Sequence, residues 1–476
     1  MVVLIRMVEE ENHMNSESQI DDLVKRYELM VDNGESRYFD VEEFEMLIGH
    51  YLSFGEVENA QMVLHYASNL FPESINLQLR EAQILAGLGK HIKAIPRLQN
   101  LLAFEPQNEE IHLTLASIYS QMEEHIKAID HFKNAFNNSD KELKSEIRLD
   151  IALEYENLGD WKKAIFVLEE ALSHDSSNEA ALYELAFCYD KINDLQSAIK
   201  FFNQFLDENP YSNIGWYNLG NAYHRIGSIK KALDAYDFAI AINDKFIQAY
   251  QQKAEAFGCN DNFSDALETY LEIFEIEGAT PHTLCSIGEC YERLHKYSEA
   301  EIYYKKCLDL NEGYPDAFIG LGVLGDIQSD DALAVTCFEH AVLLAPENTD
   351  YRLLLATALM KLAKPQEAEA QFVKILEREP KNIEAWEGRV DNLQRLNAHE
   401  AALELLEEGL KTVSETTHLR YQEFVSTFFS GEEAKALDVL ETLLINHYDN
   451  ARRIFKSFPD LLNDNRIADR YNRLKP

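Results

Sequence analysis

Three glycines, Gly320, Gly322 and Gly325, form the pattern GxGxxG, which can belong to a dinucleotide-binding loop. That chemistry needs a β-strand before the glycines and a helix opening after them, so that backbone N–H groups at the helix start face a pyrophosphate. No strand pattern precedes Gly320. The glycines fall instead at positions inside a helix where other helices press close. We interpret them as packing residues and predict that the protein has no nucleotide cofactor.

The residues nearest to a metal-ligating set are His282, Cys285 and Cys290. A zinc site needs a fourth ligand at suitable spacing, and none follows. The sequence also lacks HExxH, GxSxG, P-loop and EF-hand patterns. Outside the helical pattern described next, no segment is large enough for a catalytic domain. We predict no catalytic residues, no metal site and no enzymatic activity.

Residues 213–246 carry apolar residues at the three-four spacing of two amphipathic helices, which are separated at Gly227. The shared faces consist of Trp216, Leu219, Gly220 and Tyr223 in the first helix and of Ala232, Tyr236 and Ala239 in the second.

A 34-residue frame set on this segment places an alanine at its twentieth position twelve times. The only departure from the period is a two-residue insertion, Leu143–Lys144, between the third and fourth frames. Alanine is expected where two helices cross closely, because a larger side chain would push their backbones apart. The alanines are Ala60, Ala94, Ala128, Ala164, Ala198, Ala232, Ala266, Ala300, Ala334, Ala368, Ala402 and Ala436.

This unit resembles the tetratricopeptide repeat, whose pattern is an aromatic, Leu-Gly, Tyr, and then Ala, Phe, Ala and Pro. In residues 213–246 only the final proline is missing, and Asp244 stands in its place. The resemblance covers residues 41–450. It implies an all-α fold, a right-handed α-solenoid superhelix of about twelve helix-turn-helix units. It also implies that the first helices of the repeats line a concave groove in which peptides or partner helices bind.

The chain divides into four parts on this pattern. Residues 1–16 are acidic and without period, and we predict a disordered leader. Residues 17–40 are predicted to hold a helix that caps the first repeat, with Ser18 as a candidate cap. The twelve-repeat solenoid follows at 41–450, and residues 451–476 are predicted to form basic C-terminal capping helices.

The net charge of −39 predicts a partner with basic residues and argues against nucleic acid. Residues 451–476 are the exception, with a net charge of +4. Six scattered cysteines, with no CxxC pair, are typical of a reducing compartment. No apolar run is long enough to span a membrane, and the start lacks a signal-peptide core. Cytoplasmic localisation is therefore expected.

A candidate binding surface follows from the helical register. If positions 4, 7, 8 and 11 of each first helix face the core, then positions such as 5, 6 and 9 face the concave groove. In repeats five to seven, these positions hold aromatic, amide and acidic side chains, which supply binding area and hydrogen bonds to a peptide backbone. The predicted partner-binding residues are Tyr183, Phe187, Tyr217, Asn218, Asn221, Gln251, Gln252 and Glu255.

Two family sub-types are disfavoured by the same positions. The carboxylate clamp for chaperone tails places lysines at positions two and five, which here hold Ile214 and Tyr217. The asparagine ladder of sugar-transferring enzymes repeats Asn at position six, which here varies. The sequence therefore favours a non-enzymatic adaptor or scaffold that binds an extended or helical segment of a partner protein. Two alternatives stay open: a non-catalytic subunit of an enzyme or assembly complex, and a self-associating structural protein.

Overall fold

The computed structural model describes residues 16–34, 36–414 and 416–474. These residues form helices, turns and bends, and the described ranges contain no β-strand. The predicted all-α fold of repeated helix pairs is therefore confirmed. The predicted leader 1–16 lies outside the described residues apart from Ser16, with which the first described helix begins. None of the described helices is both long and apolar enough to cross a membrane.

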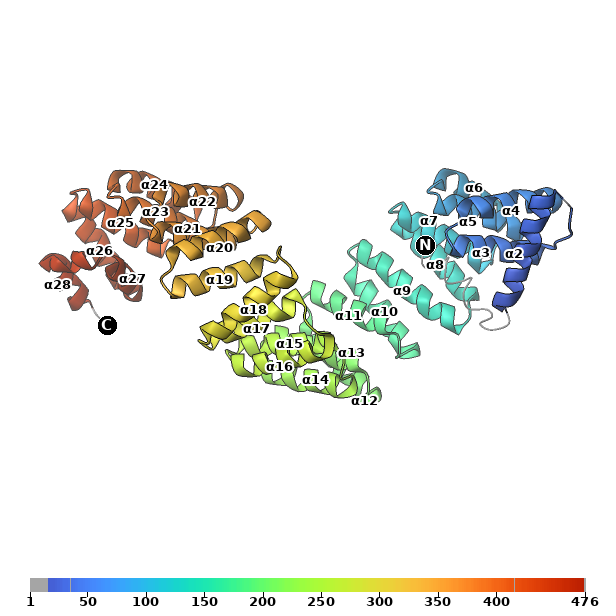
Figure 1. Cartoon of the computed structure of the whole chain (residues 1–476), viewed down its shortest axis with the longest axis horizontal. Helices are drawn as coiled ribbons and strands as arrows, with labels where there is room; N and C mark the ends of the chain where they lie inside the picture. Colours follow the sequence, from blue (N-terminus) through green and yellow to red (C-terminus); the bar gives the residue numbers. More distant parts are fainter. Residues whose placement is uncertain (1–15, 35, 415, 475–476) are drawn as a thin grey trace. The chain divides into compact units, whose positions relative to one another are not determined.

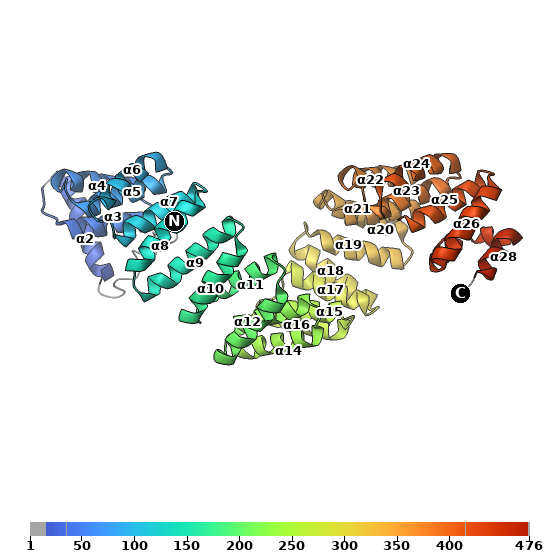
Figure 2. The ribbon, with the colours of Figure 1, turned by 180° about the vertical axis from the view of Figure 1, so that it is seen from behind.

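The chain falls into two compact units that meet in sequence between Phe246 and Ile247. Figure 1, and Figure 2 from the opposite side, show that the helices of each unit follow one another in sequence order. The first unit contains α2 (Ser16–Asn33), α3 (Val41–Ser53), α4 (Val57–Leu70), α5 (Ile75–Gly87), α6 (His91–Leu102), α7 (Glu109–Gln121), α8 (His125–Asn138), α9 (Lys141–Asn157), α10 (Trp161–His174), α11 (Glu179–Lys191), α12 (Leu195–Glu208), α13 (Asn213–Arg225) and α14 (Ile229–Ile242).

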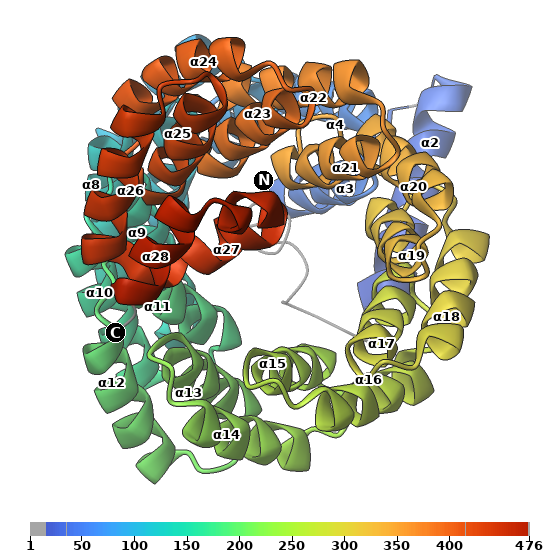
Figure 3. The same cartoon turned by 90° about the vertical axis from the view of Figure 1, so that its left-hand side faces the viewer.

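The second unit continues the helix pairs and ends in shorter elements. It contains α15 (Ile247–Cys259), α16 (Phe263–Glu277), α17 (Pro281–Arg293), α18 (Tyr297–Leu310), α19 (Pro315–Ile327), α20 (Asp331–Leu344), α21 (Thr349–Lys361), α22 (Pro365–Arg378), α23 (Ile383–Arg395), α24 (His399–Thr412), α25 (Thr417–Phe429), α26 (Glu433–His447), η1 (Tyr448–Asn450), α27 (Ala451–Ser457), η2 (Pro459–Asn463) and α28 (Asn465–Arg473). In this unit the first helices α15, α17, α19, α21 and α23 lie on the inner side of the curve, and their partners α16, α18, α20, α22 and α24 lie outside (Figure 3). In the first unit α9, α11 and α13 are likewise inside α8, α10 and α12.

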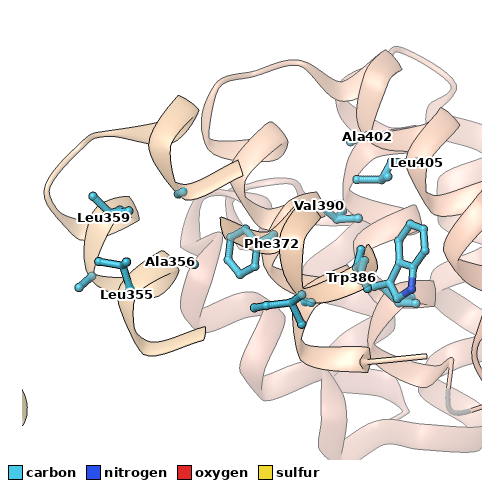
Figure 4. Packing of buried hydrophobic residues seen from close by; sticks show 14 of the residues in the cluster. Leu355, Ala356, Leu359, Phe372, Trp386, Val390, Ala402 and Leu405 are labelled. Atoms are coloured by element: carbon cyan, nitrogen blue, oxygen red, sulfur yellow. The ribbon is translucent and has the colours of Figure 1, made fainter. Parts of the chain in front are cut away.

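The twentieth-position alanines lie where the helices cross. Every one of the twelve is buried, and none exposes more than 3% of its surface. Between the crossings, aromatic and aliphatic side chains of consecutive repeats form the core, as Phe372, Trp386 and Leu405 do in the second unit (Figure 4). Because each repeat buries its apolar face on its neighbours, the core runs along each unit instead of closing around one centre.

The turn inside each repeat uses one residue with positive φ, at the fifteenth position. Glycine occupies it in five repeats, for example Gly55 and Gly227. In the other seven repeats the same left-handed conformation is taken by another residue, and Ala363, with φ 58°, is the one with neither a polar side chain nor a missing Cβ. The turn geometry is therefore uniform although the glycine signal in the sequence is not.

The junction between repeats is fixed by a hydrogen bond that the sequence analysis did not predict. In five repeats a proline follows the end of the second helix. In each of them, a side-chain nitrogen of the residue six positions later forms a hydrogen bond with the carbonyl oxygen of the proline. The pairs are Gln78 with Pro72 (3.0 Å), His112 with Pro106 (3.1 Å), Trp216 with Pro210 (2.9 Å), Arg352 with Pro346 (2.7 Å) and Trp386 with Pro380 (2.9 Å).

The two-residue insertion does not separate the third repeat from the fourth as predicted. It lies inside α9, which has 17 residues against 13 in α11 and α13. Asp140 caps this helix by accepting a hydrogen bond from the backbone N–H of Leu143 at 2.9 Å, so the helix begins four residues before the predicted start at residue 145. The extra length adds a turn at the start of the first helix.

Candidate functional site

Three of the predicted residues form an exposed aromatic group on the inner face of the first unit. Tyr183 and Phe187 lie on α11 and expose 38% and 44% of their surface, and half-buried Tyr217 lies on α13. The Tyr183 and Tyr217 rings meet edge to face with centroids 6.3 Å apart. We call Tyr183, Phe187 and Tyr217 the inner aromatic cluster. The ring of Tyr217 packs against the buried rings of Tyr236 and Phe246, with centroids 6.3 and 5.2 Å away, so it presents area without having to become ordered on binding.

A residue absent from the prediction, Trp161, completes the surface at its N-terminal side. Its indole ring meets the Phe187 ring edge to face at 6.0 Å. The ammonium group of Lys191 also lies over the Phe187 ring, 4.8 Å from its centroid. Trp161 is the first residue of a second helix, and the sequence analysis considered only first helices as lining the groove.

Two carboxyl groups lie beside the inner aromatic cluster. Glu184 of α11 and Glu156 of α9 lie close enough for their charges to interact, and the buried thiol of Cys188 donates to Glu156 at 3.2 Å. Burial raises the pKa of both carboxyl groups above the ordinary value, and the charge of Glu184 raises that of Glu156 further. A cation placed between these two carboxyl groups would favour their ionised forms.

The predicted role of Asn218 as an exposed binding residue is wrong. Asn218 exposes only 3% of its surface, and its side-chain N–H donates to the backbone carbonyl oxygen of Leu182 in the preceding first helix at 3.0 Å. Gln422, at the same sixth position of the last repeat, likewise donates to the carbonyl of Glu387 at 3.0 Å. In these two repeats the amide at position six faces the neighbouring first helix rather than the groove and ties the two helices together.

Asn221 is half-buried and accepts a hydrogen bond from the hydroxyl of Tyr236 at 2.8 Å. The remaining predicted residues, Gln251, Gln252 and Glu255, belong to α15 of the second unit. There Gln251 and Gln252 are half-buried, Glu255 is exposed, and Gln252 donates to Glu255 at 2.9 Å. They form a separate polar surface on their own unit.

The GxGxxG glycines are packing residues. A Cβ on Gly320 would lie 2.2 Å from the ring of Tyr304, and one on Gly322 would lie 2.4 Å from the ring of Phe338. Gly325 faces the backbone of Ala334, which a Cβ would approach to 3.1 Å. All three lie within α19, so no helix N-terminus follows them to receive a pyrophosphate.

The side chains considered above as possible metal ligands are either buried in the packing or exposed to solvent. Cys285 and Cys290 are buried, burial raises the pKa of the Cys290 thiol to about 12, and His282 is exposed. Within the described ranges, no three His, Cys, Asp or Glu side chains are placed to hold a metal ion.

A serine, a histidine and a carboxylate also meet between α7, α8 and α9. Ser120 and the Nδ1 of His125 both bind the carboxylate of buried Glu154, at 2.5 and 2.7 Å. The carboxylate thus stands in the middle, whereas an activated serine needs the histidine as its own partner.

The basic C-terminal segment is largely engaged with the repeat before it. Arg466 pairs with Glu433 at 2.7 Å, and Arg470 and Arg473 pair with Glu441 at 3.3 and 2.6 Å. Below these pairs, Ile454, Phe455, Leu461 and Ile467 are buried. Acidic residues of α26 therefore neutralise part of the positive charge of this segment.

Family models of the tetratricopeptide repeat match residues 158–219, 214–246, 281–314 and 353–414. No curated protein matches the chain significantly. Many solved structures are similar. The crystal structure of MamA protein is 28% identical and covers 35% of this chain and 92% of its own, with a TM-score of 0.31. A tetratricopeptide repeat protein from Parabacteroides merdae ATCC 43184 is 19% identical and covers 52% and 98%, with a TM-score of 0.42. The APC/C hetero-tetramer Cut9-Hcn1 is 15% identical and covers 90% and 94%, with a TM-score of 0.40.

Proposed function

Because the chain is a tetratricopeptide repeat protein, we propose that it is a non-enzymatic scaffold that binds a segment of a partner protein on the inner face of its first unit. The segment is extended or helical, carries lysine or arginine, and places an apolar side chain on the inner aromatic cluster. The observation that carries this proposal is that Glu184 follows Tyr183 on α11, and that Cys188, which follows Phe187 on the same helix, binds Glu156.

The two parts of this surface contribute differently to binding. Exposed aromatic rings held by their neighbours give contact area at a low cost in side-chain entropy. The carboxyl pair repels itself when both groups are ionised, and a ligand cation removes that repulsion. On a chain with net charge −39, the attraction of a basic ligand raises chiefly the association rate, so binding weakens as salt rises. On the second unit, Gln251, Gln252 and Glu255 offer a comparable surface for the same class of ligand.

The test uses fluorescein-labelled peptides in which lysine and arginine flank a leucine, titrated with the full chain. We expect Tyr183→Ala combined with Phe187→Ala to weaken binding by about tenfold or more, as loss of two anchor side chains does. Glu156→Gln combined with Glu184→Gln should weaken it and flatten its salt dependence. Tyr211→Ala is the matched control, because it removes an aromatic that is 84% exposed and lies between α12 and α13. Equal affinity in all variants would exclude the inner face.

Two alternative functions stay predictions. Service as a non-catalytic subunit predicts co-purification with an active protein from the native cell. Self-association predicts a solution mass above that of one 54.8 kDa chain, measured by light scattering.

A further inference from the structure

A second groove lies on the outer side of the first unit, between the second helices α8 and α10. Its floor is α9, and its volume is about 280 Å³. Its walls combine cations with aromatic rings, unlike the acidic inner face. The residues used below are Lys133 and Phe136 of α8, Arg148 and Tyr155 of α9, and Lys163 and Phe166 of α10.

The cations of this groove lie over its rings. Lys133 and Lys163 both lie over Tyr155, 5.6 and 5.3 Å from its ring centroid, and Lys133 also donates a hydrogen bond to the Tyr155 hydroxyl at 3.1 Å. Arg148 lies 4.6 Å from the centroid of Phe136. A ring that packs against one side of a cation keeps the positive charge in place. The other side of the cation remains available to a ligand.

The position of Arg148 follows from the insertion in α9. Arg148 occupies the fourth position of its repeat, where Trp216 stands in the sixth repeat and stacks on Phe238 at 4.5 Å. Trp216 also binds the carbonyl of Pro210, six residues before it. In the fourth repeat the insertion and the replacement of that proline by Asp140 remove this acceptor, because Asp140 instead caps α9.

Arg148 consequently has an unsatisfied donor. Its Nε is buried and has no hydrogen-bond partner in the described part of the chain, although 12% of the side chain is exposed. Its guanidinium group reaches Glu170 at 3.4 Å, a long contact at the edge of the groove. A cation thus stands where the sixth repeat has a stacked aromatic pair.

The charge balance of the groove remains positive when nearby acids are included. Glu170 faces Arg148, and Asp160 pairs with Lys163 at 2.6 Å. Lys144, one of the two inserted residues, adds another cation 5.4 Å from the centroid of Phe136. In a chain with net charge −39, a net basic groove contrasts with the bulk of the surface.

We propose that this outer groove binds an acidic segment of a partner protein that carries one apolar side chain. The carboxylates of the segment contact Lys133, Lys163 and the guanidinium of Arg148. Its apolar side chain rests on Phe166, which exposes 67% of its surface. This site is separate from the inner aromatic cluster of α11 and α13 and selects ligands of the opposite charge, so the first unit can hold a basic segment and an acidic segment at different places.

The test titrates the full chain into fluorescein-labelled peptides in which glutamates flank a phenylalanine, a leucine or a tryptophan. We expect at least one peptide to bind in a salt-dependent manner. Lys133→Glu combined with Lys163→Glu should weaken binding about tenfold or more, since two charge contacts become repulsive. Lys162→Glu is the matched control, because Lys162 is exposed on the same helix but does not line the groove. It should change the affinity less than about twofold.

Three outcomes would overturn the proposal. These are no binding of any acidic peptide to the unaltered chain, an equal loss with Lys162→Glu, and full competition by inorganic phosphate at the concentration of the peptide, which would indicate a simple anion site. Circular dichroism of each variant checks that the helices are intact. The peptides with lysine and arginine used for the inner face should keep their affinity in the Lys133→Glu and Lys163→Glu variant, which separates the failure of this proposal from that of the inner-face proposal.

Discussion

Replacing Gly322 with alanine tests whether the glycine pattern is a packing device. Gly322 lies in the middle of α19, where an added Cβ would come within 2.4, 2.7 and 3.0 Å of three atoms of the Phe338 ring. Phe338 exposes only 3% of its surface, so the ring is enclosed and cannot swing into solvent. Overpacking of this kind costs about 1–3 kcal/mol. The better helix propensity of alanine returns about 0.5–1 kcal/mol, which leaves a net loss of stability.

The control and the rescue come from the same chain. Gly258 lies in α15 with only one atom within contact range of a new Cβ, at 4.0 Å, so Gly258→Ala should be neutral or stabilising. In the fourth repeat the corresponding pair is Ala152 and Leu168, both fully buried. Adding Phe338→Leu to Gly322→Ala should therefore recover part of the loss, because leucine leaves room for the methyl group.

The measurement is urea denaturation followed by circular dichroism, with hydrogen exchange of α19 and α20 as the local readout. Repeat arrays can unfold in parts, so the local readout assigns the loss to the right helices. If Gly322→Ala matches Gly258→Ala in urea midpoint, or if Phe338→Leu makes Gly322→Ala worse by its full single-mutant cost, the ring contact does not explain the glycine.

Three further predictions follow from single contacts. Asn218→Ala should lower stability by about 1–2 kcal/mol, because it leaves the carbonyl of Leu182 without its side-chain donor; denaturation and hydrogen exchange of α11 and α13 measure this. Burial and the adjacent His112 lower the pKa of His131 from 6.5 to about 4, so the stability given by its neutral ring is complete above pH 6.5 and is lost as the pH falls toward 4; an NMR titration in which His131 gains its proton near pH 6.5 would contradict this. Ala363→Gly should stabilise the chain by about 0.5–1 kcal/mol, since glycine adopts φ 58° without strain, and an unchanged or lower urea midpoint would contradict it.

The repeat fold was predictable because one physical requirement recurs at a fixed spacing. A crossing that excludes anything larger than alanine leaves the same residue at Ala60, Ala232 and Ala436, and the structure buries all three completely. The inner face was predicted less well. Tyr183 and Tyr217 do meet, but Asn218 is buried, because the sequence period identifies the face toward the partner helix and not the face toward the next repeat.

The hydrogen bonds at the proline junctions could not be predicted from the sequence, although both residues of each pair could be seen in it. Pro210 and Trp216 were each visible as a helix stop and an aromatic position, yet nothing in either residue alone indicates that the indole N–H binds the proline carbonyl. The rule emerges only when Gln78 and Arg352, chemically unlike tryptophan, are seen to donate to the same atom of their own prolines. After a proline junction, position four therefore holds a hydrogen-bond donor, which need not be an aromatic residue.

The fourth repeat departs from the other proline junctions in a way that favours a second function there. Where the proline is present, the donor at position four is used within the repeat junction and contributes to stability. Where the insertion replaces the proline with Asp140, the helix gains a cap, the junction loses its acceptor, and the donor Arg148 keeps an unpartnered Nε beneath a net basic groove. An arginine there, next to the inserted Lys144, makes physical sense if an anion from outside the chain binds the exposed part of its guanidinium group.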